Sequence, residues 1–168
     1  MVVRLLLGIM SDSHDNLPKI DAAVTKLNSL GVEHVLHAGD FCAPFAALPY
    51  QRLEAKMLGV FGNNDAERGL LAQKFQSVGH QVEGRFASPK IDGVKIALMH
   101  GDETRLFQSL STTQAYDLII FGHTHQLSQS QEGRTALLNP GGVCGYLSGR
   151  ATIATFDTRN RRVEILDI

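Results

Sequence analysis

The chain has few cysteines and no long apolar run, and each shortage excludes a class of protein. Its 168 residues contain two cysteines, Cys42 and Cys144, too few for the disulfide framework of a small secreted domain. The most apolar segment, residues 2–10, carries Arg4 and is far shorter than the roughly 20 residues that cross a bilayer. We therefore expect a cytoplasmic protein without a membrane span.

The chain also lacks an excess of basic residues. Lys and Arg number 16 against 17 Asp and Glu, which gives a formal net charge of -1. Charge therefore gives no reason to expect a nucleic-acid partner, because such proteins are usually basic. With no internal repeat, low-complexity tract or Pro/Ser-rich linker, we expect one domain over residues 1–168. The oligomeric state stays open, with a homodimer as one option.

The first half of the chain alternates between predicted strands and helices. Residues 17–30 carry apolar side chains at helical spacing and end before Gly31, which is typical of a helix. A second helical segment is expected at residues 45–53. Three apolar segments that run into polar loops are predicted strands: residues 2–10, 34–40 and 56–65. Such β-α-β units predict parallel strands covered by helices.

The second half predicts more antiparallel pairing. Residues 89–101 suggest two strands around the tight turn at Asp92 and Gly93. A helix is expected at residues 104–115, followed by a strand that enters a loop at residues 117–125. The remainder, with "QEGR" and "DTRNRR" between β-rich runs, predicts hairpins. Together these elements indicate an α/β sandwich with mixed sheets.

Short polar blocks follow nearly every predicted core strand, namely "SDSHDN", "AGDF", "GNND", "MHGD" and "GHTH". In open α/β sheets, ligands bind in the crevice outside the carboxyl ends of the strands. We therefore expect the five blocks to converge on one site. They contribute the candidate metal ligands Asp12, His14, Asp40, Asn63, His100, His123 and His125.

These seven carboxylate, amide and imidazole groups are too many ligands for one tetrahedral ion. They suit two divalent ions that share a carboxylate. The absence of thiolates among these ligands argues against a closed structural zinc site and favours Mn²⁺, Fe²⁺, Ni²⁺ or Zn²⁺. The residues alone do not divide the ligands between two ions. Single blocks also have plainer alternatives, since Asp12 or a serine could cap the helix near Leu17, and "GNND" is a good turn sequence.

The order of the blocks resembles the calcineurin-like metallophosphoesterase superfamily, in particular its small single-domain phosphodiesterase branch. The resemblance rests on Asp12-x-His14, Gly39-Asp40, Gly62-Asn63, His100-Gly101 and Gly122-His123-x-His125. It implies a four-layer α/β/β/α sandwich with two mixed β-sheets. It assigns one ion to Asp12, His14, Asp40 and His125, and the other to Asn63, His100 and His123, with Asp40 bridging both. We expect two divalent ions per chain, with Mn²⁺ ahead of Ni²⁺, Fe²⁺ and Zn²⁺.

The resemblance also implies hydrolysis of a small phosphodiester by a hydroxide that bridges the two ions. Asp40, Asn64 and Asp65 are the candidate catalytic residues, although Asp65 has the alternative of only orienting a neighbour. Members of the superfamily often carry a histidine at the position of Asn64. Asparagine cannot supply a proton at neutral pH. We therefore predict a preference for good leaving groups, and for diesters over alkyl monoesters.

Two other functions compete with this interpretation. A scaffold subunit of the retromer complex has the same fold, but its ligand set is substituted, whereas all seven ligand positions are intact here. A metallohydrolase acting on a non-phosphate substrate is a minor alternative. We assign no function to His34, His37 or His80. Cys42 is a packing residue or a redox-sensitive neighbour of the metals.

Overall fold

The computed structural model describes residues 5–168, so the first residues of the predicted strand at 2–10 lie outside the described part. The helices are α1 (Leu17–Leu30), α2 (Arg68–Ser77), α3 (Thr104–Thr113) and two short 3₁₀ helices, η1 (Pro44–Ala47) and η2 (Pro49–Arg52). The first sheet has the strand order β12 (Val163–Asp167), β11 (Thr152–Asp157), β1 (Leu6–Met10), β2 (His34–His37), β3 (Lys56–Gly59) and β4 (Gln81–Val82). The second has the order β5 (Phe86–Ala87), β7 (Val94–Met99), β8 (Leu118–Ile120), β10 (Thr135–Asn139) and β9 (Ser128–Glu132), with β6 (Lys90–Ile91) paired to β7.

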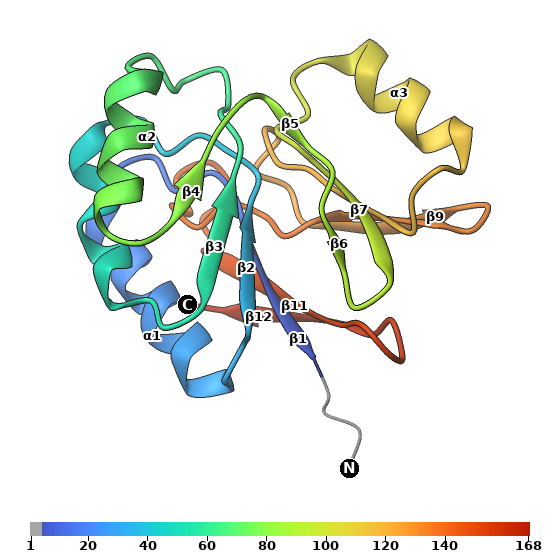
Figure 1. Ribbon diagram of the computed structural model, residues 1–168, viewed down its shortest axis with the longest axis horizontal. Helices are drawn as coiled ribbons and strands as arrows, with labels where there is room; N and C mark the ends of the chain where they lie inside the picture. The colour runs from blue at the N-terminus through green and yellow to red at the C-terminus, as the bar shows by residue number, and fades with distance from the viewer. Residues whose placement is uncertain (1–4) are drawn as a thin grey trace.

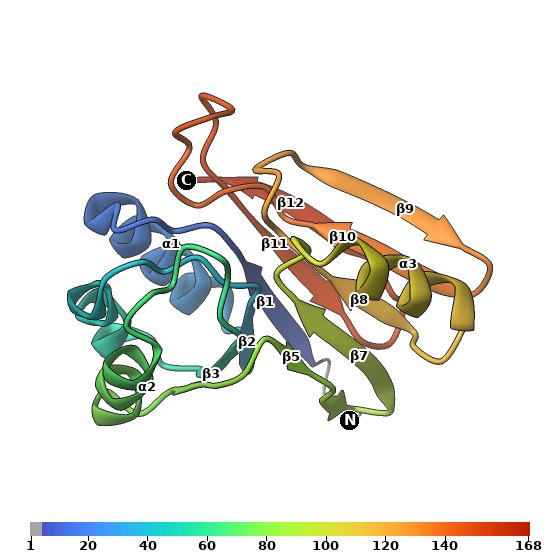
Figure 2. The ribbon, with the colours of Figure 1, turned by 90° about the horizontal axis from the view of Figure 1, so that it is seen from above.

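The two sheets face each other, and helices cover both outer faces (Figures 1 and 2). In Figure 2, α1 and α2 lie on the outer side of the first sheet, and α3 lies on the outer side of the second. Both sheets are mixed: β1 pairs in parallel with β2 and antiparallel with β11, while β8 pairs in parallel with β7 and β10, and β9 runs antiparallel. The expected four-layer α/β/β/α sandwich is confirmed.

Strand β1 is buried on both faces, which explains its unbroken apolar sequence. Leu7 and Ile9 belong to the core between the two sheets, whereas Met10 packs in the core beneath α1 and α2. Gly8 faces α1, where an added Cβ would lie 2.7 Å from the Leu27 side chain. The glycine thus lets α1 approach the sheet closely. A third, smaller core lies between the second sheet and α3.

Helix α1 matches the predicted range of residues 17–30. Its N-cap is Asn16, whose side-chain oxygen accepts a hydrogen bond from the Lys19 N–H at 3.4 Å. The helix ends at Gly31, which has a left-handed φ of 64°, a conformation that glycine adopts without strain. Asp12 therefore does not cap this helix, and that alternative is wrong.

Two predicted helices differ from the observed ones. The segment 45–53 forms η1 and η2 instead of one helix, because Pro49 has no N–H to continue the hydrogen-bond ladder. Helix α3 begins at Thr104 as expected but ends at Thr113, since Gln114 takes a left-handed φ of 55°. The predicted hairpins are present, including β6 and β7 around Asp92 and Gly93, both with positive φ.

Helix α2 was not predicted. It buries only Leu71 and Phe75, which is too few apolar positions to produce a clear helical pattern. Within residues 5–168, no helix is long and apolar enough to cross a membrane.

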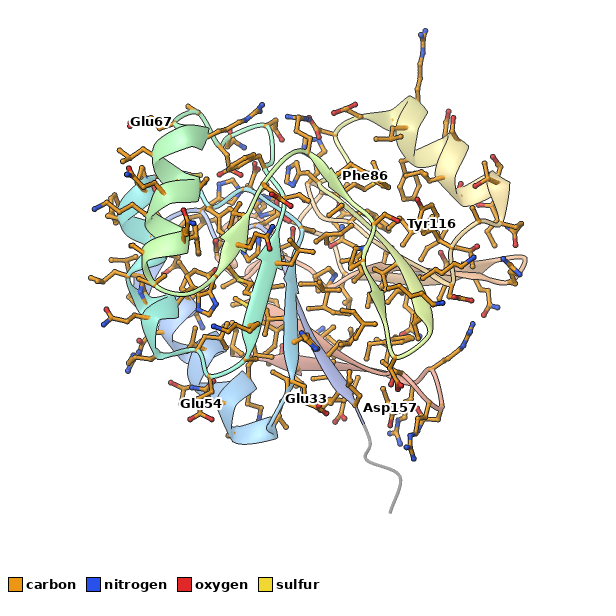
Figure 3. All side chains as sticks on the ribbon, viewed as in Figure 1. Glu33, Glu54, Glu67, Phe86, Tyr116 and Asp157 are labelled. Carbon is orange, nitrogen blue, oxygen red and sulfur yellow. The ribbon has the colours of Figure 1, made fainter. Side chains whose placement is uncertain are left out.

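The loops that follow the parallel strands all lie at one edge of the sandwich. In Figure 3, Glu33 and Glu54, which precede β2 and β3, lie at the lower end of the molecule, and Glu67 lies at the upper end beyond β3. The polar blocks after β1, β2 and β3 therefore share the upper edge, where β7 of the second sheet also ends (Figure 1). Strand β8 pairs in parallel with β7 and so ends on the same side.

Candidate metal centre

The five polar blocks converge at this edge, as the sequence predicted. Five of the seven predicted ligands have a left-handed backbone: Asp12 (φ 53°), His14 (40°), Asp40 (60°), His123 (69°) and His125 (57°). Such conformations cost on the order of 1–3 kcal/mol each for non-glycine residues and persist only where surrounding contacts impose them. Here, the Asp12 N–H donates to the Gly39 carbonyl and the His14 N–H to the Asp40 carbonyl, both at 3.0 Å.

Glycines in the blocks make room for the ligand side chains. A Cβ on Gly62 would lie 2.6 Å from the backbone nitrogen of Asp40, and a Cβ on Gly122 would lie 2.5 Å from Oδ2 of Asp12. Both distances are shorter than real Cβ contacts allow. Gly62 and Gly122 are thus steric requirements of the site.

One half of the site is built from Asp12, His14 and His125, with donor atoms that all lie within 4.8 Å of one another. Nε2 of His125 lies 3.5 Å from Oδ1 of Asp12, and Nε2 of His14 lies 3.8 Å from the same oxygen. Asp12 is fully buried, and its Oδ2 accepts a hydrogen bond from the His123 N–H at 3.1 Å. Oδ1 is thereby directed toward the two imidazoles.

The other half is built around Asn63. Its Oδ1 lies 2.9 Å from Nε2 of His100 and 3.0 Å from Nδ1 of His123. Nδ1 of His100 contacts the Ala38 carbonyl at 2.8 Å, so this nitrogen carries a proton, and Nε2 is the nitrogen that would bind an ion once it is deprotonated. Such backbone support of the second imidazole nitrogen is usual for metal ligands.

Asp40 lies between the halves. Its Oδ2 is 3.4 Å from Nε2 of His14 and 3.2 Å from Nε2 of His100. Asp12, Asp40 and His100 also form a group of donor atoms within 4.8 Å of one another, so both carboxylates are near both halves. Asp40 is the one whose carboxylate contacts an imidazole ring from each half.

The spacing of these atoms fits metal ligation. Ligands bound at about 2.1 Å are separated from one another by about 3.0–3.4 Å in octahedral or tetrahedral geometry, close to the observed nitrogen–oxygen distances. Oδ1 of Asp12 and Nε2 of His14 are buried and have no hydrogen-bond partner within residues 5–168. Buried polar atoms rarely stay unpaired, and a bound cation would satisfy both.

Charge interactions in the site keep Asp40 ionised. Burial opposes ionisation of Asp40, but hydrogen bonds from His100 and Asn64 outweigh it and hold its pKa well below the usual range. Burial likewise opposes protonation of His100, yet the neighbouring Asp40 carboxylate raises the pKa of His100. Burial lowers the pKa of His125. An ionised carboxylate among imidazoles is the donor set that divalent cations bind.

Asn64 and Asp65 support the site in different ways. The backbone N–H and the side-chain amide of Asn64 donate to the two oxygens of Asp40, at 2.9 and 2.7 Å. Asp65 is buried, and its carboxylate accepts hydrogen bonds from backbone N–H groups of Asp40, Cys42 and Gly62 at 2.7–3.0 Å. Asp65 therefore connects the second and third blocks.

Two cysteines contact histidines of the site; the sequence left Cys42 open as a packing residue or a neighbour of the metals, and it gave no indication of Cys144. Sγ of Cys42 lies 3.2 Å from Nδ1 of His14, and Sγ of Cys144 lies 3.5 Å from Nδ1 of His125. Burial raises the pKa of the Cys42 thiol to about 12 and also raises that of Cys144. Such a thiol is a poor redox sensor, because oxidation proceeds through the thiolate. The position of Cys42 two residues after Asp40 was the only signal in the sequence.

A second unpredicted feature connects the loops around Asn63 and His100. Arg85 donates to Asp102 at 2.5 Å and to Glu103 at 2.8 Å, and reaches the Gly62 carbonyl at 3.5 Å. Its guanidinium therefore joins the "GNND" and "HGDE" segments beside the site.

The chain matches a known protein family. Residues 5–161 match the calcineurin-like phosphoesterase superfamily domain. The chain belongs to this superfamily. The resemblance inferred from the five blocks is thus confirmed over most of the chain.

Members of the superfamily that resemble this chain include enzymes. Phosphodiesterase MJ0936 from Methanocaldococcus jannaschii is 35% identical over 156 residues, which cover 92% of this chain and 94% of the relative. A solved structure of an archaeal phosphodiesterase is 33% identical, with a TM-score of 0.93, and covers 98% of this chain and 100% of its own. Wild-type Vps29 from Entamoeba histolytica, solved with Zn²⁺, shares the fold at 21% identity and a TM-score of 0.66, with 98% of each chain covered.

Proposed function

We propose that the protein is a phosphodiesterase that depends on two divalent metal ions and hydrolyses small phosphodiesters. The position of Asp40 is the main support, because its Oδ2 lies 3.4 Å from His14 and 3.2 Å from His100. One carboxylate oxygen that contacts ligands of both halves suits a bridge between two ions. Asp12, His14 and His125 would complete one ion's ligands, and Asn63, His100 and His123 the other's.

Two ions in such a site supply an activated water as the nucleophile and neutralise charge on the phosphoryl oxygens. The residues of the chain hold that site in place. Asn64 orients Asp40 through two hydrogen bonds, and the Ala38 carbonyl fixes the ring of His100. Mn²⁺ is our first candidate for both ions, with Ni²⁺, Fe²⁺ and Zn²⁺ as alternatives.

Asn64 bears on the choice of substrate. Its side-chain amide is used to hold Asp40, and an amide has no proton to give to a leaving group at neutral pH. Substrates whose leaving group departs without protonation are therefore favoured. The similarity to Phosphodiesterase MJ0936 supports a diester as the substrate, rather than an alkyl monoester.

The first experiment removes the metal and restores single ions. Metal-stripped protein is assayed on bis(p-nitrophenyl) phosphate with Mn²⁺, Ni²⁺, Zn²⁺ or Mg²⁺, beside the variants Asp40→Asn and His123→Ala. We expect activity to return with a metal in the wild type and to stay absent in both variants. Activity that is independent of metal, or that persists in both variants, would refute the proposal.

The second experiment compares leaving groups. An aryl phosphodiester, the matching aryl monoester and an alkyl monoester are assayed with the same metal. We expect turnover to fall in that order. Robust hydrolysis of the alkyl monoester would contradict the role inferred for Asn64.

The scaffold alternative is weaker. The Vps29 structure resembles this chain less than the archaeal phosphodiesterase does, at TM-scores of 0.66 and 0.93, and all seven ligand residues are present here. Measured metal binding without hydrolysis of any phosphoester, with every ion tested, would favour the scaffold.

A further inference from the structure

Two thiols contact two of the candidate metal ligands at Nδ1, the ring nitrogen that does not face the carboxylates. Cys42 contacts His14 and Cys144 contacts His125, in each case through Sγ and Nδ1, at 3.2 and 3.5 Å. The two imidazoles are themselves stacked, with ring centroids 4.9 Å apart. The pair of histidines is thus supported by sulfur on the side away from the carboxylates.

Metal ligation through Nε2 would determine which nitrogen of each ring carries the proton. Nε2 of His14 faces Asp40 at 3.4 Å, and Nε2 of His125 faces Asp12 at 3.5 Å. A nitrogen that binds a metal uses its lone pair, so the proton must lie on Nδ1. The sulfur atoms lie where an Nδ1–H donor needs an acceptor. His100 has the same arrangement, with the Ala38 carbonyl as the acceptor at 2.8 Å.

Backbone contacts hold each sulfur in position. Cys42 has a φ of 79°, and its N–H donates to Asp65 at 2.7 Å. The Cys144 N–H donates to the Asp12 carbonyl at 3.0 Å, and its carbonyl accepts from the side chain of Asn16 at 3.0 Å. A left-handed conformation at a non-glycine residue is costly. The left-handed conformation of Cys42 is consistent with a need to direct its side chain toward His14.

We propose that Cys42 and Cys144 are positioning residues for the metal centre. Each thiol sulfur accepts a hydrogen bond from Nδ1–H of its histidine, and so holds the ring in the tautomer that presents the Nε2 lone pair to the ion. The thiols themselves do not bind the ion. This inference rests on the proposed function, because His14 and His125 are taken as metal ligands.

The test replaces each cysteine by serine, which keeps an acceptor, and by alanine, which removes it. The first readout is the Zn²⁺ dissociation constant, measured by competition with a chelator and without substrate. We expect each alanine variant to bind about 10-fold more weakly or worse, since loss of such a partner typically costs 10–100-fold in affinity. The serine variants should recover most of the loss.

The second readout is the tautomer of each imidazole in metal-free protein, from ring ¹⁵N–¹H spectra recorded where the rings are neutral. We expect His14 in Cys42→Ala, and His125 in Cys144→Ala, to lose the Nδ1–H form. His100 is the internal control and should not change. Because this spectrum needs neither metal nor substrate, it tests the thiols even if the protein proves not to be a phosphodiesterase.

Unchanged tautomers and wild-type Zn²⁺ affinity in the alanine variants would overturn the proposal. Equal losses in the serine and alanine variants, with His14 and His125 keeping their tautomers, would also overturn it, because that result indicates packing alone.

Discussion

Asp65 is expected to stabilise the metal centre without touching the substrate, and Asp65→Asn tests this. In the wild type, Oδ2 accepts from the N–H groups of Asp40 and Gly62 at 3.0 and 2.7 Å, and Oδ1 accepts from that of Cys42 at 2.7 Å. An asparagine can keep its oxygen toward the first two donors. Its NH₂ group then faces the Cys42 N–H, donor against donor.

The expected cost follows from that single lost contact. A hydrogen bond to a charged group contributes about 1.5–3 kcal/mol, and an unsatisfied buried donor costs a similar amount. We expect Asp65→Asn to lower the free energy of unfolding by about 2–3 kcal/mol, measured by urea denaturation of the metal-free protein. Metal affinity should fall as well, because Asp65 holds the loop that carries Asp40.

Asp15→Asn is the matched control. Asp15 accepts one backbone hydrogen bond in the site region, from the Ala43 N–H at 2.9 Å, and an amide oxygen can replace that acceptor. Its cost should stay below about 1 kcal/mol. The reasoning is refuted if Asp65→Asn matches the wild type in stability and metal affinity. If Asp65→Asn keeps its stability and metal affinity but loses kcat, Asp65 has a direct catalytic role.

Two further predictions concern a buried histidine and a glycine of the site. Burial lowers the pKa of His37 to about 3. Below about pH 6.5 the unfolded chain therefore binds a proton that the folded chain does not. His37 thus lowers the free energy of unfolding as pH falls, by about 1.4 kcal/mol per pH unit. His37→Gln should flatten the decline in unfolding free energy between pH 7 and pH 5, whereas the control His34→Gln should not. Equal slopes in the wild type and both variants would contradict this prediction. Gly62→Ala should weaken Mn²⁺ binding at least about 10-fold, because its Cβ would lie 2.6 Å from the backbone nitrogen of Asp40. In the control Gly69→Ala the Cβ meets nothing within 4 Å, and similar Mn²⁺ affinities in the two variants would count against a steric role for Gly62.

The sequence predicted the convergence of the ligands because β-α-β units give parallel strands, and parallel strands place the loops after β1, β2 and β3 at one edge. It also predicted α1, whose apolar spacing and terminal Gly31 are clear. It missed α2, because only Leu71 and Phe75 are buried there. A local pattern cannot reveal a helix that contributes so little apolar surface to the core.

The supporting contacts of the site were beyond sequence reasoning for a different reason. Residue spacing indicates which loop a side chain belongs to, but not the direction in which it points. The left-handed backbone of Cys42 and the contact between Asn16 and Cys144, 128 positions apart, depend on the assembled fold. Asp65 likewise turns toward three backbone donors, which its place in "GNND" does not indicate.

The number and coupling of bound Mn²⁺ ions test the central claim most directly. Metal-stripped protein is titrated with Mn²⁺ and followed by electron paramagnetic resonance, beside Asn63→Ala. We expect two ions per chain with a spin-coupled signal, because one oxygen of Asp40 contacts ligands of both halves, and we expect the coupled signal to be absent in Asn63→Ala. A single ion per chain at full phosphodiesterase activity, or two ions without coupling, would contradict the account.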